Sequence, residues 1–290
     1  MTKHTVTYKT VDGIDLLADL YLPEVAGPRP VVVWLHGGAL IMGSREYIWE
    51  GHREAFLRAG YAIVSVDYRL APETKLPEIA ADVFDAFRWV RGTAPARYPL
   101  DPTRIAVAGQ SAGGYLSLLV GTTLRPPVQA VVSFYGYGDI IGDWYRLPDP
   151  FYLQEPPVSE EEARASVGTA PVSQGGEERD KFYLYCRQQG RWLQEVVGLD
   201  PATQAAAFAP YYPVQNVAPD GPPTLLLHGD KDTDVPYEQS VMMAVALARA
   251  GVAHGLITVP GGGHGFEAED GPAVEEALTR VPPFLKQYLG

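Results

Sequence analysis

The chain has 290 residues, of which 46% are hydrophobic and 20% are charged. This length and composition exclude a disulfide-stapled miniprotein and fit either one large α/β domain or two small ones with a full core. The 23 Lys and Arg residues against 35 Asp and Glu residues give a formal net charge of −12, which argues against nucleic acid as a partner.

Short apolar runs rich in β-branched residues alternate with longer amphipathic stretches, a pattern that predicts βαβ units. A hairpin at 6–10 and 14–21 precedes strands at 31–35, 61–66, 105–108, 128–134, 224–227 and 256–259. Helices are predicted at 46–59, 77–91, 112–123, 238–250 and 272–280, with Pro282 and Pro283 breaking the last one. We therefore expect one α/β domain over residues 1–290, with a mostly parallel sheet of about eight strands and helices on both faces.

Residues 136–209 interrupt this alternation and are too numerous for an ordinary loop. They are dense in Tyr, Trp, Pro and charge, and they contain helical pieces at 160–165 and 181–197. We interpret them as an inserted cap. Its aromatic residues either line a substrate pocket or form the cap's own core, and the sequence leaves both open: Tyr137, Trp144, Tyr145, Phe182, Tyr183, Tyr185 and Trp192.

The strongest local signal is GQSAGG at residues 109–114, directly after one predicted strand and directly before a predicted helix. A serine on such a sharp strand-to-helix turn is crowded, so the residues two positions on either side must be small. Both are glycine here. The pattern predicts a nucleophile elbow with Ser111 as the nucleophile, next to a helix N-terminus that favours negative charge.

A serine hydroxyl needs a base, and an imidazole held by a carboxylate is the common solution. His264 lies in a glycine-rich loop straight after the last predicted strand, where its ring can reach the serine. His228 ends a strand and His254 precedes one, and we expect structural roles for both. His264 is therefore the predicted base.

Three aspartates after the strand at 224–227 compete for the carboxylate position: Asp230, Asp232 and Asp234. Their alternation imitates the start of a calcium loop. That loop needs glycine at its sixth position and glutamate at its twelfth, where this chain has Val235 and Val241. We therefore expect no calcium site and no other metal.

The intermediate of acyl transfer is an oxyanion, which needs backbone NH donors. The sequence His36-Gly37-Gly38-Ala39 follows the strand at 31–35 and offers such donors without bulky side chains. Gly38 is the first choice, with Gly37 or Ala39 beside it and the NH of Ala112 completing the hole. His36 then organises the loop and is not a base.

Together these motifs resemble the α/β-hydrolase superfamily, and more narrowly the hormone-sensitive-lipase-like esterases, with similarity also to prolyl oligopeptidase-type catalytic domains. The resemblance covers most of the chain and implies an α/β-hydrolase fold. It includes residues 67–73, which resemble the DYRLAPE segment of those esterases, and residues 101–105, which lead into the elbow. Serine, acid and histidine also fall in the chain order of that fold.

Residues 228–236 are similar to the His-Gly-x-x-Asp-x-x-Val-Pro pattern of the oligopeptidase branch. This similarity implies Asp232 as the triad carboxylate, with Asp230 and Asp234 as alternates. Two residues depart from the esterase pattern: Ala39 replaces the last glycine of His-Gly-Gly-Gly, and Gln110 replaces an acidic residue before the serine. The departures concern the subfamily and leave the triad intact.

The resemblance and the motifs predict a serine carboxylesterase acting on small to medium uncharged esters, without cofactor or metal. Amide cleavage, as in aminopeptidases or arylformamidases, uses the same machinery and is the alternative. An exopeptidase needs a carboxylate for the substrate's amino group, and Asp143, Glu155 or residues 160–162 are candidates. A non-catalytic receptor on this fold is disfavoured because serine, acid and histidine are all present.

The single cysteine, Cys186, has no internal disulfide partner and indicates a reducing compartment. The amino-terminal residues lack the apolar run of a signal peptide, and no stretch approaches the ~18 apolar residues of a membrane span. We expect a cytoplasmic protein whose partner is a small-molecule ester, not a membrane. The sequence leaves the oligomeric state open, and a homo-oligomer is compatible with it.

Overall fold

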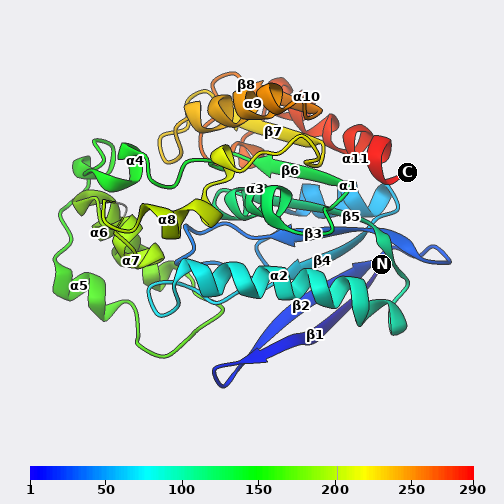
Figure 1. Ribbon diagram of the computed structural model, residues 1–290, viewed down its shortest axis with the longest axis horizontal. Coiled ribbons are helices and arrows are strands. Elements are labelled where there is room, and N and C mark those ends of the chain that lie inside the picture. Colours follow the sequence, from blue (N-terminus) through cyan, green and yellow to red (C-terminus); the bar gives the residue numbers. More distant parts are fainter. Residues whose placement is uncertain (201) are drawn as a thin grey trace.

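The computed structural model describes residues 1–200 and 202–290 and is built around an eight-stranded sheet with the order β1-β2-β4-β3-β5-β6-β7-β8 (Figure 1). The strands are β1 (Thr2–Val11), β2 (Ile14–Leu22), β3 (Arg29–Leu35), β4 (Ala62–Val66), β5 (Leu100–Gln110), β6 (Ala130–Phe134), β7 (Thr224–Gly229) and β8 (His254–Val259). Strand β2 pairs antiparallel with β1 and β4, and the remaining neighbours are parallel. The predicted fold class, a mostly parallel eight-stranded sheet, is confirmed.

Helices cover both faces of the sheet, as two separate apolar clusters show. The bounds of the main helices are α1 (Glu50–Arg58), α2 (Leu76–Gly92), α3 (Ala112–Thr123), α9 (Glu238–Ala250), α10 (Pro272–Thr279) and α11 (Val281–Leu289). Buried side chains of α2, α3 and α9 belong to one cluster, and those of α1, α10 and α11 belong to the other. In β3, Val31 and Val33 join the first cluster while Val32 and Trp34 join the second, because successive side chains of a strand point to opposite faces.

The predicted elements differ from the observed ones mainly at their ends. Strand β5 begins at Leu100, earlier than expected, and the first helix begins at Glu50. The helix predicted over 181–197 is wrong as one piece: α6 ends at Gln189, Gly190 takes a left-handed φ of 62°, and α7 begins at Trp192. The helix α10 ends at Thr279, before the two prolines. Pro282 and Pro283 lie in the first turn of the next helix, α11, where a missing NH is tolerated.

Residues 136–209 contain α4 (Asp143–Arg146), α5 (Glu160–Ala165), α6 (Asp180–Gln189), α7 (Trp192–Val197) and α8 (Ala205–Phe208). Figure 1 shows these short helices gathered at one end of the sheet, on the left of the view. The segment leaves β6 and returns to β7, so its two ends are tied to neighbouring strands. We call residues 136–209 the insertion. Among the helices of the described residues, none is long and apolar enough to cross a membrane.

Candidate active site

Ser111 lies in the tight turn between β5 and α3, with 8% of its surface exposed. Its φ of 54° and ψ of −120° are disfavoured for a residue with a side chain. The turn accepts only glycine at its flanks: a Cβ on Gly109 would lie 2.4 Å from the Gly113 carbonyl oxygen, and one on Gly113 would lie 2.0 Å from the Leu35 carbonyl oxygen. The backbone thus presents the Ser111 hydroxyl beyond the carboxyl end of β5.

His264, in the loop after β8, brings its imidazole to Ser111. Its Nε2 lies 3.1 Å from Ser111 Oγ, and its Nδ1 lies 2.8 Å from Asp232 Oδ2. Since a carboxylate only accepts hydrogen bonds, the Nδ1–H donates to Asp232 and the Nε2 lone pair faces the serine hydroxyl. Three of the predicted residues are therefore in contact, in the tautomer that proton abstraction requires.

Asp232 is fully buried after β7 and is held on both oxygens. Its Oδ1 accepts hydrogen bonds of 2.9 Å from the NH groups of Asp234 and Val235. Its Oδ2 faces His264 Nδ1 and also His228 Nε2, which is 3.3 Å away. Burial raises the pKa of Asp232, but the hydrogen bonds with His228 and His264 outweigh it and hold this pKa well below its ordinary value. The carboxylate is ionised.

The pKa of His264 is raised above its ordinary value. Burial alone lowers it, but the negative charge of Asp234 and the hydrogen bond with Asp232 act in the opposite direction and prevail, with a smaller effect from Glu267. Acidic groups that surround an imidazole stabilise the imidazolium form. The surroundings of His264 therefore favour its charged, imidazolium form.

The other histidines and aspartates named from the sequence have different contacts. His228 Nδ1 lies 2.7 Å from the Ser240 hydroxyl, so His228 braces the loop that carries Asp232. Asp230 accepts a hydrogen bond of 2.7 Å from the Gly261 NH, in the loop that leads to His264. His254 lies at the start of β8, at the end of that strand opposite to His264.

The loop after β3 lies against the elbow, because a Cβ on Gly37 would be 3.3 Å from Ser111 Cβ. Gly38 has a φ of 105°, and a Cβ there would lie 2.2 Å from the Met42 carbonyl oxygen. Ala39 follows with a left-handed φ of 55°. Within residues 1–200 and 202–290, the NH groups of Gly37, Gly38, Ala39 and Ala112 donate to no protein acceptor. Of these four residues, Gly37 lies against Ser111 and Ala112 follows it in the chain.

Residues 67–73, singled out by resemblance, support this loop. Tyr68 donates a hydrogen bond of 2.8 Å to the His36 carbonyl oxygen and stacks on the His36 ring at 4.1 Å. His36 Nδ1 donates to the Gly37 carbonyl oxygen at 2.7 Å. Burial lowers the pKa of His36 to about 4, so its ring is neutral. His36 thus fixes the loop from within, with its ring bonded to Gly37 and stacked on Tyr68.

Arg179, in the insertion, joins the same loop to residues 67–73. Its guanidinium donates to the Ile41 carbonyl oxygen at 2.6 Å and to the Ala71 carbonyl oxygen at 2.7 Å. It also forms a buried ion pair with Glu73 at 2.6 Å. A single side chain of the insertion therefore joins it to two other parts of the chain, and no sequence motif singles Arg179 out.

The aromatic residues of the insertion pack mainly on each other. Trp192 is fully buried, stacks on Tyr145 at 3.9 Å and donates from Nε1 to the Ala39 carbonyl oxygen at 3.0 Å. Trp144 stacks on the other side of Tyr145 at 3.6 Å. Of the two interpretations left open by the sequence, these contacts favour a core of the insertion's own, which also holds the loop of Gly38 in place.

Asp234 lies beside Nε2 of His264, the ring nitrogen that does not contact Asp232. Its Oδ2 is 3.4 Å from Nε2, while its Oδ1 accepts hydrogen bonds from Tyr152, Tyr183 and Arg187. Arg187 is 1% exposed. The sequence offered Asp234 only as an alternate for the triad. In the structure Asp232 contacts Nδ1 of His264, whereas Asp234 lies beside Nε2, the nitrogen that faces Ser111.

Behind the imidazole, the Tyr135 ring packs edge-on against His264 at 4.7 Å between ring centres. The Tyr135 hydroxyl donates to the buried carboxyl of Glu267, three residues after His264. Burial raises the pKa of Glu267, more than its hydrogen bonds lower it. Neither residue was predicted, because no local motif marks a side chain that acts by packing.

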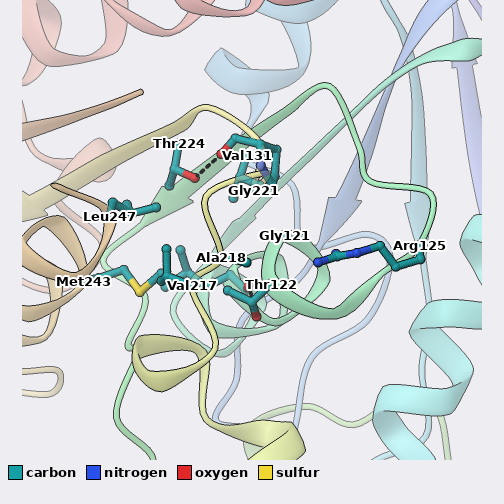
Figure 2. Close-up of a pocket in the computed structure, with 12 residues that line it drawn as sticks. Gly121, Thr122, Arg125, Val131, Val217, Ala218, Gly221, Thr224, Met243 and Leu247 are labelled. Carbon is teal, nitrogen blue, oxygen red and sulfur yellow. Dashed lines mark hydrogen bonds between the residues drawn. The ribbon is translucent and has the colours of Figure 1, made fainter. Parts of the chain in front are cut away.

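A metal centre does not accompany this site in the described residues, and the small cavity drawn in Figure 2 lies elsewhere. No group of three or more His, Cys, Asp and Glu side chains there is arranged to hold a metal ion. Figure 2 shows a small cavity of about 10 Å³ between α3 and α9, which is room for about one water. It lies at Val131 and Thr224, near the amino ends of β6 and β7, whereas Ser111 follows the carboxyl end of β5.

The comparisons with known proteins agree with the fold. Residues 32–268 match the family described as alpha/beta hydrolase fold, and the chain belongs to this family. The predicted resemblance to the hormone-sensitive-lipase-like branch is confirmed.

Two curated proteins and one solved structure illustrate the similarity. The chain is 30% identical over 300 residues to the non-reducing polyketide synthase atr1 of Stereocaulon alpinum, covering 90% of this chain and 12% of the synthase. It is 29% identical to the esterase LipC of Mycobacterium tuberculosis, covering 90% of this chain and 59% of LipC. The metagenomic carboxylesterase EstE1 is 25% identical, with a TM-score of 0.74 over 100% of this chain and 90% of EstE1.

Proposed function

We propose that the chain is a serine esterase that cleaves small to medium carboxylic esters through an acyl-enzyme on Ser111. The observation that carries the proposal is the series of contacts from Ser111 Oγ to His264 at 3.1 Å and from His264 to Asp232 at 2.8 Å. The similarity to LipC and EstE1, an esterase and a carboxylesterase by name, supports ester substrates.

In the first half-reaction, Ser111 Oγ forms a bond to the acyl carbon while its proton moves to His264 Nε2. The carbonyl oxygen becomes an oxyanion, for which the free NH groups of Gly38 and Ala112, with Gly37 or Ala39, are the proposed donors. Collapse of the intermediate breaks the bond to the leaving oxygen, which takes the proton from Nε2. Asp232 stabilises the imidazolium throughout.

In the second half-reaction, water attacks the acyl carbon and loses its proton to His264. The bond between Ser111 Oγ and the acyl carbon breaks, and the serine recovers its proton from Nε2. The acid product leaves, and no cofactor or metal takes part in this scheme.

We propose that the insertion acts as a cap that restricts the acyl pocket. Trp192 and Arg179 tie it to the loop of Gly38, so it borders the site from a fixed position. Filling an apolar pocket contributes about 0.8 kcal/mol per CH₂ until the wall is reached. Catalytic efficiency should therefore peak at acyl chains of roughly two to eight carbons and fall for longer ones.

A single panel tests this function. It combines p-nitrophenyl esters from acetate to palmitate with aminoacyl and formyl anilides, all assayed on one preparation. We expect brisk ester cleavage with a maximum at short or medium chains. An efficiency that still rises at palmitate contradicts the restricted pocket. Anilide cleavage without ester turnover contradicts the esterase proposal and supports the amide alternative.

The amide alternative has weaker support from the residues first considered for it. Asp143 pairs with Arg146 at 2.7 Å on the surface, and Glu162 forms a capping box with Ser159 at the start of α5.

We also propose a cytoplasmic location, supported by the single, buried Cys186. We propose no role for nucleic acid, because the net charge is −12.

A further inference from the structure

Asp234 places a second carboxylate at the reactive side of His264. Its Oδ2 lies 3.4 Å from Nε2, the same atom that lies 3.1 Å from Ser111 Oγ. Asp232 occupies the opposite nitrogen, so the two aspartates have separate positions. The Asp234 side chain is 17% exposed and that of His264 is 25% exposed, so this corner of the site reaches solvent.

The other oxygen of Asp234 is fixed by three donors from the insertion. Tyr152 donates to Oδ1 at 2.8 Å, Tyr183 at 2.5 Å and Arg187 at 2.7 Å. Burial and the negative charge of Asp234 raise the pKa of Tyr152, so this hydroxyl stays a neutral donor. With Oδ1 saturated, Oδ2 remains turned toward Nε2, and its one close contact among the described residues is His264.

The positive charge of Arg187 does not cancel the charge of Asp234. Arg187 is shared between two carboxylates, because it also pairs with Asp149 at 2.5 Å. One guanidinium against two aspartates leaves one negative charge in this cluster. Asp232 adds another on the far side of the imidazole, and Glu267 lies behind the Tyr135 ring. The corner near Nε2 is therefore acidic.

The leaving group must pass through this corner. In the proposed mechanism the leaving oxygen takes its proton from His264 Nε2, so it lies within hydrogen-bond distance of that atom. Atoms two or three bonds farther along the leaving group then come close to Asp234 Oδ2. We propose that Asp234 is a specificity residue that selects substrates whose leaving group carries a positive charge, such as esters of amino alcohols. The inference rests on the proposed function and replaces, for the leaving group, the expectation of uncharged esters.

The expected size of the preference follows from the distance between the charge of the leaving group and the Asp234 carboxylate, and from the partial burial of that carboxylate. Two opposite charges roughly 5 Å apart at an effective dielectric constant of about 20 attract strongly enough for a tenfold preference or more. Exposure of the site and salt reduce the attraction. We expect a preference of about tenfold, measured as a ratio of kcat/KM values at low ionic strength.

The experiment compares acetylcholine with 3,3-dimethylbutyl acetate, a neutral ester of the same shape in which carbon replaces the quaternary nitrogen. The native protein should cleave acetylcholine about tenfold more efficiently. Asp234→Asn keeps the shape of the side chain and removes its charge, and the ratio should fall to near one. Because both esters are assayed on one preparation, the ratio does not depend on the fraction of folded protein.

Asp230→Asn is the matched control, since it removes one negative charge from the same loop at a residue whose carboxylate bonds Gly261 and not His264. This variant should keep the native ratio. An equal fall in both variants, or no preference in the native protein, overturns the inference. So does a ratio that Asp234→Asn leaves unchanged.

A second probe separates this inference from the proposed ester function. Diethyl phosphorothiolates with a thiocholine or a 3,3-dimethylbutanethiol leaving group phosphorylate a reactive serine and need no ester turnover. Faster labelling of Ser111 by the thiocholine compound, lost in Asp234→Asn, supports the inference even if no ester is cleaved. Labelling of Ser111 without charge preference overturns the inference alone. Absence of labelling at Ser111 overturns both proposals.

Discussion

The indole of Trp192 donates a hydrogen bond of 3.0 Å to the carbonyl oxygen of Ala39, which joins the insertion to the loop beside Ser111. Ala39 has a φ of 55° and Leu40 a φ of 62°, both in the left-handed region that side chains disfavour. A second contact, from the Ala71 NH to the Leu40 carbonyl oxygen at 2.8 Å, holds the same stretch. The insertion therefore helps to hold the loop whose NH groups are the proposed donors to the oxyanion.

Trp192→Phe tests this relationship. Phenylalanine keeps the aromatic packing against Tyr145 and loses the NH donor, so the protein should lose about 1 kcal/mol of unfolding free energy, up to about 3 kcal/mol if the buried carbonyl stays unpaired. Turnover of p-nitrophenyl acetate should fall while KM changes little, because the loop acts on the transition state. Denaturant unfolding and steady-state kinetics measure both effects. A variant that loses stability with unchanged kcat contradicts the link to the oxyanion loop.

The assignment of Asp232 as the acid can be tested by substituting Asp232 and its neighbour Asp230 in parallel. Asp232→Asn should lower turnover by roughly 10⁴-fold, the scale known for neutralising the carboxylate of a serine protease triad. Asp230→Asn should have a far smaller effect, since its side chain bonds the Gly261 NH. Steady-state kinetics on one ester rank the variants. A larger loss of turnover in Asp230→Asn than in Asp232→Asn would contradict the assignment of Asp232.

The raised pKa of His264 predicts the acid limb of the pH profile. Activity requires neutral imidazole, so kcat/KM should fall as the pH drops through the pKa of His264, with a midpoint above the ordinary value of about 6.5. Asp234→Asn removes a negative charge that stabilises the imidazolium and should move this midpoint to lower pH. A profile of kcat/KM against pH for the native protein and for Asp234→Asn measures both midpoints. A midpoint that moves upward contradicts the electrostatic reasoning.

The elbow glycines predict a stability difference. Gly113→Ala puts a methyl group 2.0 Å from the Leu35 carbonyl oxygen, and the forced shift should destabilise the fold by about 1–3 kcal/mol and lower turnover. Gly92, at the end of α2, has no atom within 4 Å of its Cβ position, so Gly92→Ala is the matched control. The control should change stability by no more than about 1 kcal/mol, in the stabilising direction. Denaturant midpoints compare the two.

Features that depend on residues adjacent in the chain could be predicted from the sequence. Ser111 could be predicted because the turn itself demands Gly109 and Gly113, and the sheet could be predicted because its strands are apolar on both faces. The split of 181–197 into two helices was missed, since Gly190 at a helix end reads like any glycine within an amphipathic stretch. Its left-handed conformation depends on how the insertion folds.

The partners of Asp234 could not be predicted. Arg187 lies 47 residues before Asp234, and Tyr152 lies 82 residues before it, in an insertion whose position no motif fixes. Similarly, the contact between Trp192 and Ala39 spans 153 residues. Sequence patterns single out the candidate residues for the chemistry, but the residues around them meet only through the packing of the insertion.

The central claim is that Ser111 is the nucleophile, and covalent labelling coupled to kinetics tests it most directly. The native protein and Ser111→Ala are assayed with p-nitrophenyl acetate, and each is treated with an organophosphate whose adduct is mapped by peptide mass. We expect an adduct on Ser111 of the native protein and a loss of several orders of magnitude in turnover for a folded Ser111→Ala protein. A folded variant with near-native turnover, or an adduct on another serine, would contradict it.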